Sequence, residues 1–159
     1  MKALSIFMVA LVLQSCASVN VAPPLAIERE RSRTYVMNFD KTWTRAVDWF
    51  ADHNVSIEKI EKTSGLLTAK YVLETNSTYL DCGKIDVQGV LGQPTIRRLG
   101  SLNVTVRLTS DTTTTVNVNF FGEFDLRARD AWDGRTINSE GKCVSTGDLE
   151  RKILDYVGR

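Results

Sequence analysis

The chain has 159 residues, of which 43% are hydrophobic, 25% charged and 8% aromatic. This length allows one domain, or one domain with a tail, and the composition excludes both a disordered chain and a protein that crosses a membrane several times. Lys2 is the only charged residue before Cys16, so a chain that begins at Cys16 keeps 19 of the 20 basic residues against 19 acidic ones. A nucleic-acid-binding protein usually has a basic excess, so we expect no nucleic-acid partner.

The first 15 residues have the pattern of a secretory signal. Lys2 supplies one positive charge, and an apolar run of eleven residues follows from residue 3 to residue 13. As a helix this run would span roughly 16 Å, whereas the hydrocarbon core of a bilayer is about 30 Å thick. The segment is therefore too short for a stable transmembrane helix and is typical of a cleaved signal peptide.

The residues that end this run, Leu13-Gln14-Ser15-Cys16, resemble the lipobox of bacterial lipoproteins. The resemblance implies that residues 1–15 are removed, that the Cys16 thiol is diacylated and that the new amine is acylated, with palmitate as a typical chain. Two or three acyl chains hold a protein durably at a membrane. Ala17 and Ser18 follow, with no Asp, which by resemblance to Gram-negative lipoproteins implies the periplasmic face of the outer membrane. The alternative is an ordinary signal peptide followed by a chance cysteine.

Two further cysteines, Cys82 and Cys143, are expected to form a disulfide that staples the last helix to the middle of the chain. They lie 61 positions apart, and an oxidising compartment allows them to pair. The alternatives are two buried thiols or a redox pair, although the Cys-x-x-Cys pattern of redox pairs is absent.

Residues 16–33 are expected to form a lipidated N-terminus and a flexible tether. Pro23 and Pro24 disfavour helix, and the residues from Glu28 to Arg31 are charged. Fully extended, residues 17–33 would reach roughly 60 Å, which would hold a domain clear of the lipid surface.

The first half of residues 34–159 predicts a strand, a helix and a hairpin. The strand covers residues 35–39, and Asp40 is the expected N-cap of a helix that ends near residues 52–54. The apolar face of this helix has the i, i+3, i+4, i+7 spacing and consists of Trp43, Ala46, Val47 and Phe50. The hairpin has its strands at residues 55–59 and 67–73 and its turn at residues 63–65.

The second half predicts a second hairpin and a closing helix. Residues 75–100 have no regular pattern beyond short strands at residues 85–87 and 95–97. Apolar and polar residues then alternate over residues 102–108 and again from residue 116 to about residue 126, as in two antiparallel strands with one buried face. Residues 129–142 are predicted as a loop. Ser145 is the expected cap of the last helix, with Asp148 three residues on, and the apolar face of that helix contains Leu149, Ile153 and Tyr156 or Val157.

This element order predicts a single α+β domain over residues 34–159, a two-layer antiparallel sheet with both helices on one face. The stretch from Tyr35 to Tyr71 combines an aromatic strand, an Asp-x-x-Trp helix start and a Ser-Gly-Leu-Leu hairpin. Together with the closing helix it resembles the helix-grip domains of BamC-type lipoproteins, which belong to the outer-membrane β-barrel assembly machinery. The resemblance covers about a quarter of the chain and implies a helix-grip fold and an envelope setting.

The residues do not predict catalysis. His53 is the single histidine, no Gly-x-Ser-x-Gly motif is present, and His53 has no metal-ligand spacing to Cys82 or Cys143. We therefore expect no metal and no cofactor. Glu123 and Asp125 alternate with Phe124 and are expected to share the solvent face, although they could form the acid/base pair of a cell-wall hydrolase.

Three aromatic residues do not fit the expected core, namely Trp49, Phe121 and Trp132. Because exposed aromatic residues are enriched at protein interfaces, they are candidate interface residues. The alternative is that the core wraps around them. The sequence thus predicts a non-catalytic, lipid-anchored periplasmic protein that binds a protein or an envelope component. One alternative is a carrier of a lipid or small hydrophobic ligand in a helix-grip cavity, and another is a cell-wall hydrolase.

Overall fold

The computed structural model describes residues 17–25, 27–73 and 77–159. Cys16 and the lipobox-like sequence before it lie outside these ranges. The described part of the chain contains two helices, α1 (Phe39–Asp52) and α2 (Asp148–Val157). Neither has the length and apolar character needed to cross a membrane.

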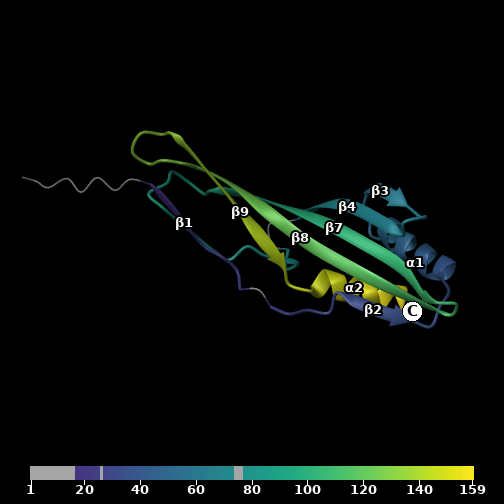
Figure 1. The fold of residues 1–159 in the computed structure, drawn as a ribbon. Helices are drawn as coiled ribbons and strands as arrows, with labels where there is room; N and C mark the ends of the chain where they lie inside the picture. Colours follow the sequence, from purple (N-terminus) through teal and green to yellow (C-terminus); the bar gives the residue numbers. More distant parts are fainter. Residues whose placement is uncertain (1–16, 26, 74–76) are drawn as a thin grey trace, which may run out of the picture.

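The described strands form two antiparallel sheets (Figure 1). The large sheet has the strand order β3-β4-β7-β8-β9-β5, with β2 also paired to β8, and the small sheet pairs β1 with β6. The strands of the large sheet are β2 (Ser32–Tyr35), β3 (Ile57–Glu61), β4 (Leu66–Leu73), β5 (Leu80–Asp81), β7 (Thr95–Ser110), β8 (Thr113–Arg129) and β9 (Thr136–Ser145). Those of the small sheet are β1 (Ser18–Ala22) and β6 (Lys84–Gln88).

The long β7–β8 hairpin carries both helices on one face. Alternate residues of the hairpin are buried, and the fully buried ones next to the helices are Leu102, Val104, Val106, Val116, Val118 and Phe120. Helix α1 contacts β7 and β8, α2 contacts β8, and the two helices contact each other. The expected α+β class, an antiparallel sheet with a helix early in the chain and a helix at its end, is confirmed.

A pair of facing glycines, Gly100 and Gly122, divides this hairpin into two halves. A Cβ atom on Gly100 would lie 2.5 Å from the Phe120 ring, and one on Gly122 would lie 2.2 Å from the Leu80 side chain. Because glycine has no side chain, Phe120 can lie against the sheet at Gly100 and Leu80 can lie against it at Gly122. One half of the hairpin packs on the helices, and the other half extends beyond them to pair with β9.

The segments beyond the helices contain two corrections to the sequence prediction. Residues 16–33 do not form a continuous tether, because β1 pairs with β6 from Ser18 to Ala22. Residues 129–142 are not a loop, because β9 begins at Thr136 and pairs with the outer half of β8. Both strands pair with a neighbouring strand that offers unpaired backbone groups. Strand β1 also packs Val19 and Val21 against the core.

The two helix starts also differ from the prediction. The N-cap of α1 is Asn38, whose side chain accepts a hydrogen bond from the Lys41 backbone N–H at 2.9 Å, so Asp40 lies inside the first turn. The N-cap of α2 is Gly147, which has no side chain to cap with. Ser145 instead donates to the buried Glu150 carboxylate at 2.6 Å, and its hydroxyl accepts from the Gly147 N–H.

Replacing Asn38 with alanine should therefore lower the free energy of unfolding by about 1 kcal/mol, because one orphan N–H of α1 loses its partner. Asp40→Ala is the comparison variant, since Asp40 forms an exposed ion pair with Lys62, which contributes little. As the acidic residue of the first turn it adds about 0.3–1 kcal/mol through the helix dipole. Urea unfolding of both variants checks this. Equal destabilisation of the two variants would contradict the assignment of Asn38 as the cap.

The predicted disulfide is present between Cys82 and Cys143. Cys143 lies within β9 and not just before α2, so the staple differs from the expected one. The bond joins β9 to the segment that follows β5, beside the short β5–β9 ladder of Leu80 with Ser145 and Asp81 with Val144. The disulfide thus secures the edge of the large sheet.

Candidate functional site

Trp49 is not an interface residue. It is 2% exposed, its ring stacks on His53 with the centroids 4.7 Å apart, and it meets the Phe50 ring edge-on at 5.2 Å. The buried face of α1 is wider than the four-residue stripe that the sequence predicts, because α1 packs against α2 as well as against the sheet. The core therefore wraps around Trp49, as the alternative interpretation of the sequence allowed.

Phe121 does lie on the surface, on the face of the sheet opposite the helices. Its side chain is 44% exposed, and in the ladder it pairs with Ser101 on β7 and Val144 on β9. Two residues along β7 from Ser101, the exposed Leu99 pairs with Val72, which is 79% exposed. Because diagonal neighbours in a sheet are within reach of aromatic side chains, these residues form one apolar patch across four strands. We call Val72, Leu99, Phe121 and Val144 the outer-face patch.

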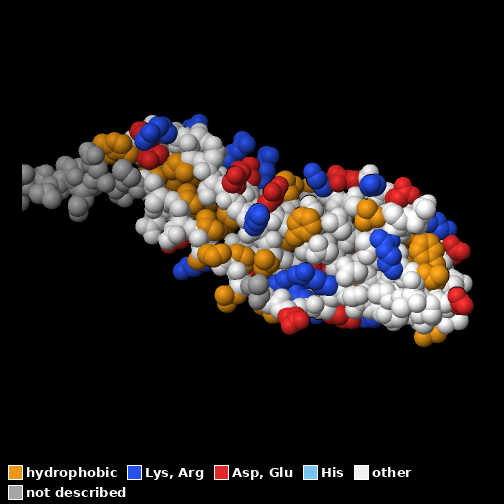
Figure 2. Space-filling view, in the orientation of Figure 1, with side chains coloured by type: hydrophobic (Ala, Val, Ile, Leu, Met, Phe, Trp, Pro, Cys, Tyr) orange, Lys and Arg blue, Asp and Glu red, His pale blue; other side chains and the backbone are white. Residues whose placement is uncertain are grey.

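Three members of this patch are not predicted from the sequence. Each of them is a single apolar residue on the outer face, so no periodic pattern marks Val72, Leu99 or Val144. The signal that could have found them is their position within an alternating segment, where each apolar residue takes a place at which the alternation predicts a polar one. Figure 2 shows hydrophobic side chains interspersed with charged ones along the sheet.

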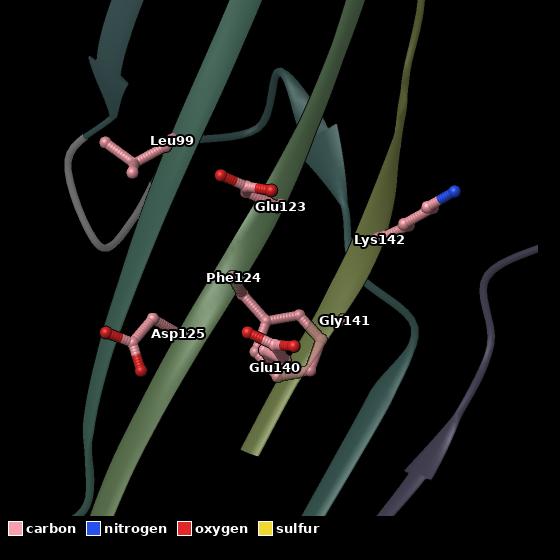
Figure 3. Close-up of a pocket in the computed structure, with 7 residues that line it drawn as sticks. All are labelled: Leu99, Glu123, Phe124, Asp125, Glu140, Gly141 and Lys142. Carbon is pink, nitrogen blue, oxygen red and sulfur yellow. The ribbon is translucent and has the colours of Figure 1, made fainter. Parts of the chain in front are cut away.

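A pocket of about 520 Å³ adjoins the outer-face patch at Leu99. Its lining contains three carboxylates and one ammonium group, from Glu123, Asp125, Glu140 and Lys142 (Figure 3). Glu123 faces Lys142 in the ladder, whereas Asp125 faces Glu140. Facing like charges destabilise a sheet unless a cation reduces their repulsion. Arg127 partly reduces this repulsion, because its Nε lies 3.7 Å from the Asp125 carboxylate.

Glu123 and Asp125 share the solvent face, as expected, and Glu140 joins them because residues 136–145 are a strand and not a loop. Figure 3 shows the Glu123 and Asp125 side chains on the β7 side of β8, while Lys142 points away from them. Among the residues that the structure describes, no group of His, Cys, Asp and Glu side chains is placed to hold a metal ion. This arrangement can bind a basic group next to an apolar one.

His53 lies at the C-terminal end of α1, as predicted, where its Nδ1 is 2.8 Å from the Trp49 carbonyl oxygen. The ring also meets Tyr156 of α2 edge-on at 5.8 Å. These contacts account for the histidine as a residue of the α1–α2 junction. His53 also lines a shallow pocket with Val72 of the outer-face patch, but no carboxylate lines that pocket. The structure does not bring His53 and the carboxylates into one site.

Trp132 is the most exposed of the three predicted interface residues, at 72%. It lies between β8 and β9, and its backbone N–H donates to the Asp130 carboxylate at 2.7 Å. Phe121 is eight residue steps from Arg129 at the end of β8, which corresponds to roughly 27 Å. Phe121 and Trp132 therefore belong to two different surfaces.

Comparisons with known proteins supply no relative, because neither a protein-family model nor a curated protein matches the chain.

Proposed function

We propose that this protein is a non-catalytic, lipid-anchored periplasmic protein that binds another envelope protein through the outer-face patch. The observation that carries the proposal is the exposure of Phe121 beside Leu99 and Val72 on an open sheet face. Contiguous exposed apolar surface costs solvation free energy in a monomer and commonly marks a binding surface. Aromatic residues at the centre of such a surface tend to dominate the binding energy.

The charges beside the patch define the partner more closely. The pocket lining carries Glu123, Asp125 and Glu140 against Lys142. Arg97 of β7 faces Asp125 and Arg127 pairs with it, whereas Glu140 faces another carboxylate. A partner segment with an apolar side chain followed by Lys or Arg would cover the outer-face patch and relieve the repulsion between Asp125 and Glu140. We therefore propose a basic, partly apolar segment of a protein as the ligand.

The anchor and the location are proposed from the N-terminal sequence. The run that ends in Leu13-Gln14-Ser15-Cys16 supports lipidation of Cys16, removal of residues 1–15 and placement at the periplasmic face of the outer membrane. The disulfide supports an oxidising compartment, because such bonds are rare in the cytosol. Globomycin, which inhibits the lipoprotein signal peptidase, should cause the full-length precursor to accumulate. Unchanged processing would contradict the anchor.

We also propose the helix-grip arrangement for the described domain. Its support is that α1 follows β2 and that α1 and the C-terminal α2 lie against each other on the β7–β8 hairpin. Large buried side chains, among them Trp49, Phe50 and Phe120, occupy the space between the helices and the sheet. This packing favours partner binding at the outer face over carriage of a ligand under the helices. A role in outer-membrane assembly or maintenance is consistent with that setting.

A photoreactive amino acid at position 121 tests the proposed interface in cells that produce the lipidated chain. Crosslinking should capture one discrete envelope protein from position 121 and not from position 117. Asn117 is the matched control, because it is exposed on the same face of β8.

The variant Phe121→Glu should then bind the captured partner about 30-fold more weakly, which corresponds to a hot-spot cost of about 2 kcal/mol. Asn117→Glu should bind it normally, and both variants should keep the unfolding midpoint of the parent. Equal capture from both positions, or unchanged affinity in Phe121→Glu, would contradict the proposed site.

A further inference from the structure

We propose that the end of the molecule that carries Leu91 and Trp132 rests on the lipid bilayer in which Cys16 is anchored. This inference depends on the lipid anchor of the proposed function and adds a second, non-covalent contact with the membrane. It also fixes which end of the domain faces the lipid.

Strand β1 lies at the same end of the molecule as Leu91 and Trp132 (Figure 1). Strand β1 begins at Ser18, which pairs with Gln88 at the end of β6. The residues that follow β6 are bound to the β8–β9 connection, because the Ala131 N–H donates to the Gly89 carbonyl at 2.9 Å and the Leu91 N–H donates to the Arg129 carbonyl at 2.7 Å. Figure 1 shows the start of β1 and the β8–β9 connection at the same end of the molecule. The chain thus leaves the domain beside Leu91 and Trp132.

The linker between Cys16 and β1 is short. Two residues extend at most about 7 Å, so the two steps from Cys16 to Ser18 provide almost no spacer. The sequence alone suggested a tether of roughly 60 Å, but that estimate requires residues 18–22 to be free, and they are paired with β6. With acyl chains on Cys16, this end of the domain lies against the headgroups.

The end of the molecule that carries Leu91 and Trp132 exposes apolar side chains. Leu91 is 58% exposed and Trp132 is 72% exposed, and tryptophan is enriched where membranes meet water. The residues from Ala17 to Ala22 and from Gln88 to Pro94 contain no charged side chain. Approach to a bilayer therefore buries apolar groups without desolvating charges on these two segments.

The charged groups that do lie near Trp132 are compatible with a lipid surface. Asp133 and Arg135 are paired with each other, and a hydrogen bond from the Arg135 backbone N–H lowers the pKa of Asp133. Arg129 is exposed at the end of β8, where a cation is attracted to anionic headgroups. The buried Asp130 carboxylate accepts the Trp132 N–H and is directed into the connection.

The test uses the lipidated full chain in vesicles of phosphatidylethanolamine and phosphatidylglycerol whose acyl chains carry bromine. Bromine quenches tryptophan fluorescence on contact, and Trp43 and Trp49 are buried in the protein. The parent protein should lose fluorescence relative to unbrominated vesicles. Trp132→Phe should lose this lipid-dependent component.

A matched variant moves the exposed tryptophan to the opposite end. Leu108 is exposed near the far end of β7, thirteen residues after Thr95, which corresponds to roughly 43 Å. The double variant Trp132→Phe with Leu108→Trp should show no quenching by the brominated lipid. Quenching from position 108, or none from Trp132 in the lipidated parent, would overturn the proposed orientation.

Mass spectrometry of the same samples separates this inference from the proposed function. A chain that carries acyl groups but leaves Trp132 unquenched overturns the membrane contact alone and leaves the anchor standing. A chain without acyl groups overturns the anchor, and the inferred contact with it.

Discussion

Replacing Cys82 and Cys143 together with serine should lower the free energy of unfolding by about 4 kcal/mol. The bond closes a loop between positions 61 residues apart, and the chain-entropy estimate for such a loop is about 4 kcal/mol. A domain of this size has a total stability of roughly 5–15 kcal/mol, so the loss is a large share of it. Urea unfolding monitored by circular dichroism measures the change.

The structure identifies which part of the fold depends on this bond. Strand β5 has two residues and meets the sheet only along β9, so its ladder alone is too short to hold the edge. The disulfide keeps Leu80 against the Gly122 backbone, where a side chain on residue 122 would collide with it. When the bond is absent, we expect the backbone amides around β5 to show the largest increase in hydrogen-exchange rate.

The parent protein in a thiol reductant is the control for this experiment, because it loses the bond without any substitution. It should unfold at the same urea concentration as the double serine variant. If the reduced parent and the variant both retain the unfolding midpoint of the oxidised parent, the disulfide does not stabilise the fold.

The elements that the sequence predicted well are those with a buried face. Residues 102–108 and 116–126 alternate because one side of β7 and of β8 is buried, and period-two burial imposes period-two hydrophobicity. The same reasoning locates α1 and α2, whose buried residues recur with helical spacing. An element can therefore be predicted from the sequence where one of its faces is buried and the buried residues recur at a regular spacing.

The elements that the sequence did not predict are strands held by backbone pairing. Burial alternates along β9, but before Cys143 it alternates between exposed and partly buried residues, most of them polar, so no stripe of large apolar residues marks the strand. Its stability comes from hydrogen bonds to the outer half of β8, and those depend on β8 being there already. Strand β1 differs, because Val19 and Val21 alternate with polar residues and pack partly buried against the core. Five residues give too short a pattern to distinguish a strand from a tether.

The candidate surfaces were predicted unequally. Phe121 and Trp132 stand out because each is a large aromatic residue in a polar context, and both are exposed. The other members of the outer-face patch are aliphatic residues whose meaning depends on the register of β4, β7 and β9. The pairing register between two strands cannot be deduced from a single sequence when one of the strands is itself not predicted. The patch could therefore be found only from the structure.

Replacing Trp49 with alanine should destabilise the fold by about 3–5 kcal/mol, the range observed when a buried Phe or Trp is truncated. Trp49 lies against Phe50 and His53, and His53 in turn meets Tyr156 of α2. The truncation therefore leaves a cavity at the junction of the two helices as well as removing buried apolar area. Thermal and urea unfolding should both show the loss.

Trp132→Ala is the matched control, because it removes the same side chain from a position that is 72% exposed. It should change the free energy of unfolding by no more than about 0.5 kcal/mol, as surface substitutions usually do. The conservative Trp49→Phe should fall between the two, since it retains an aromatic ring against His53. A Trp49→Ala variant as stable as Trp132→Ala would return Trp49 to the surface and would require α1 to be rotated on the sheet.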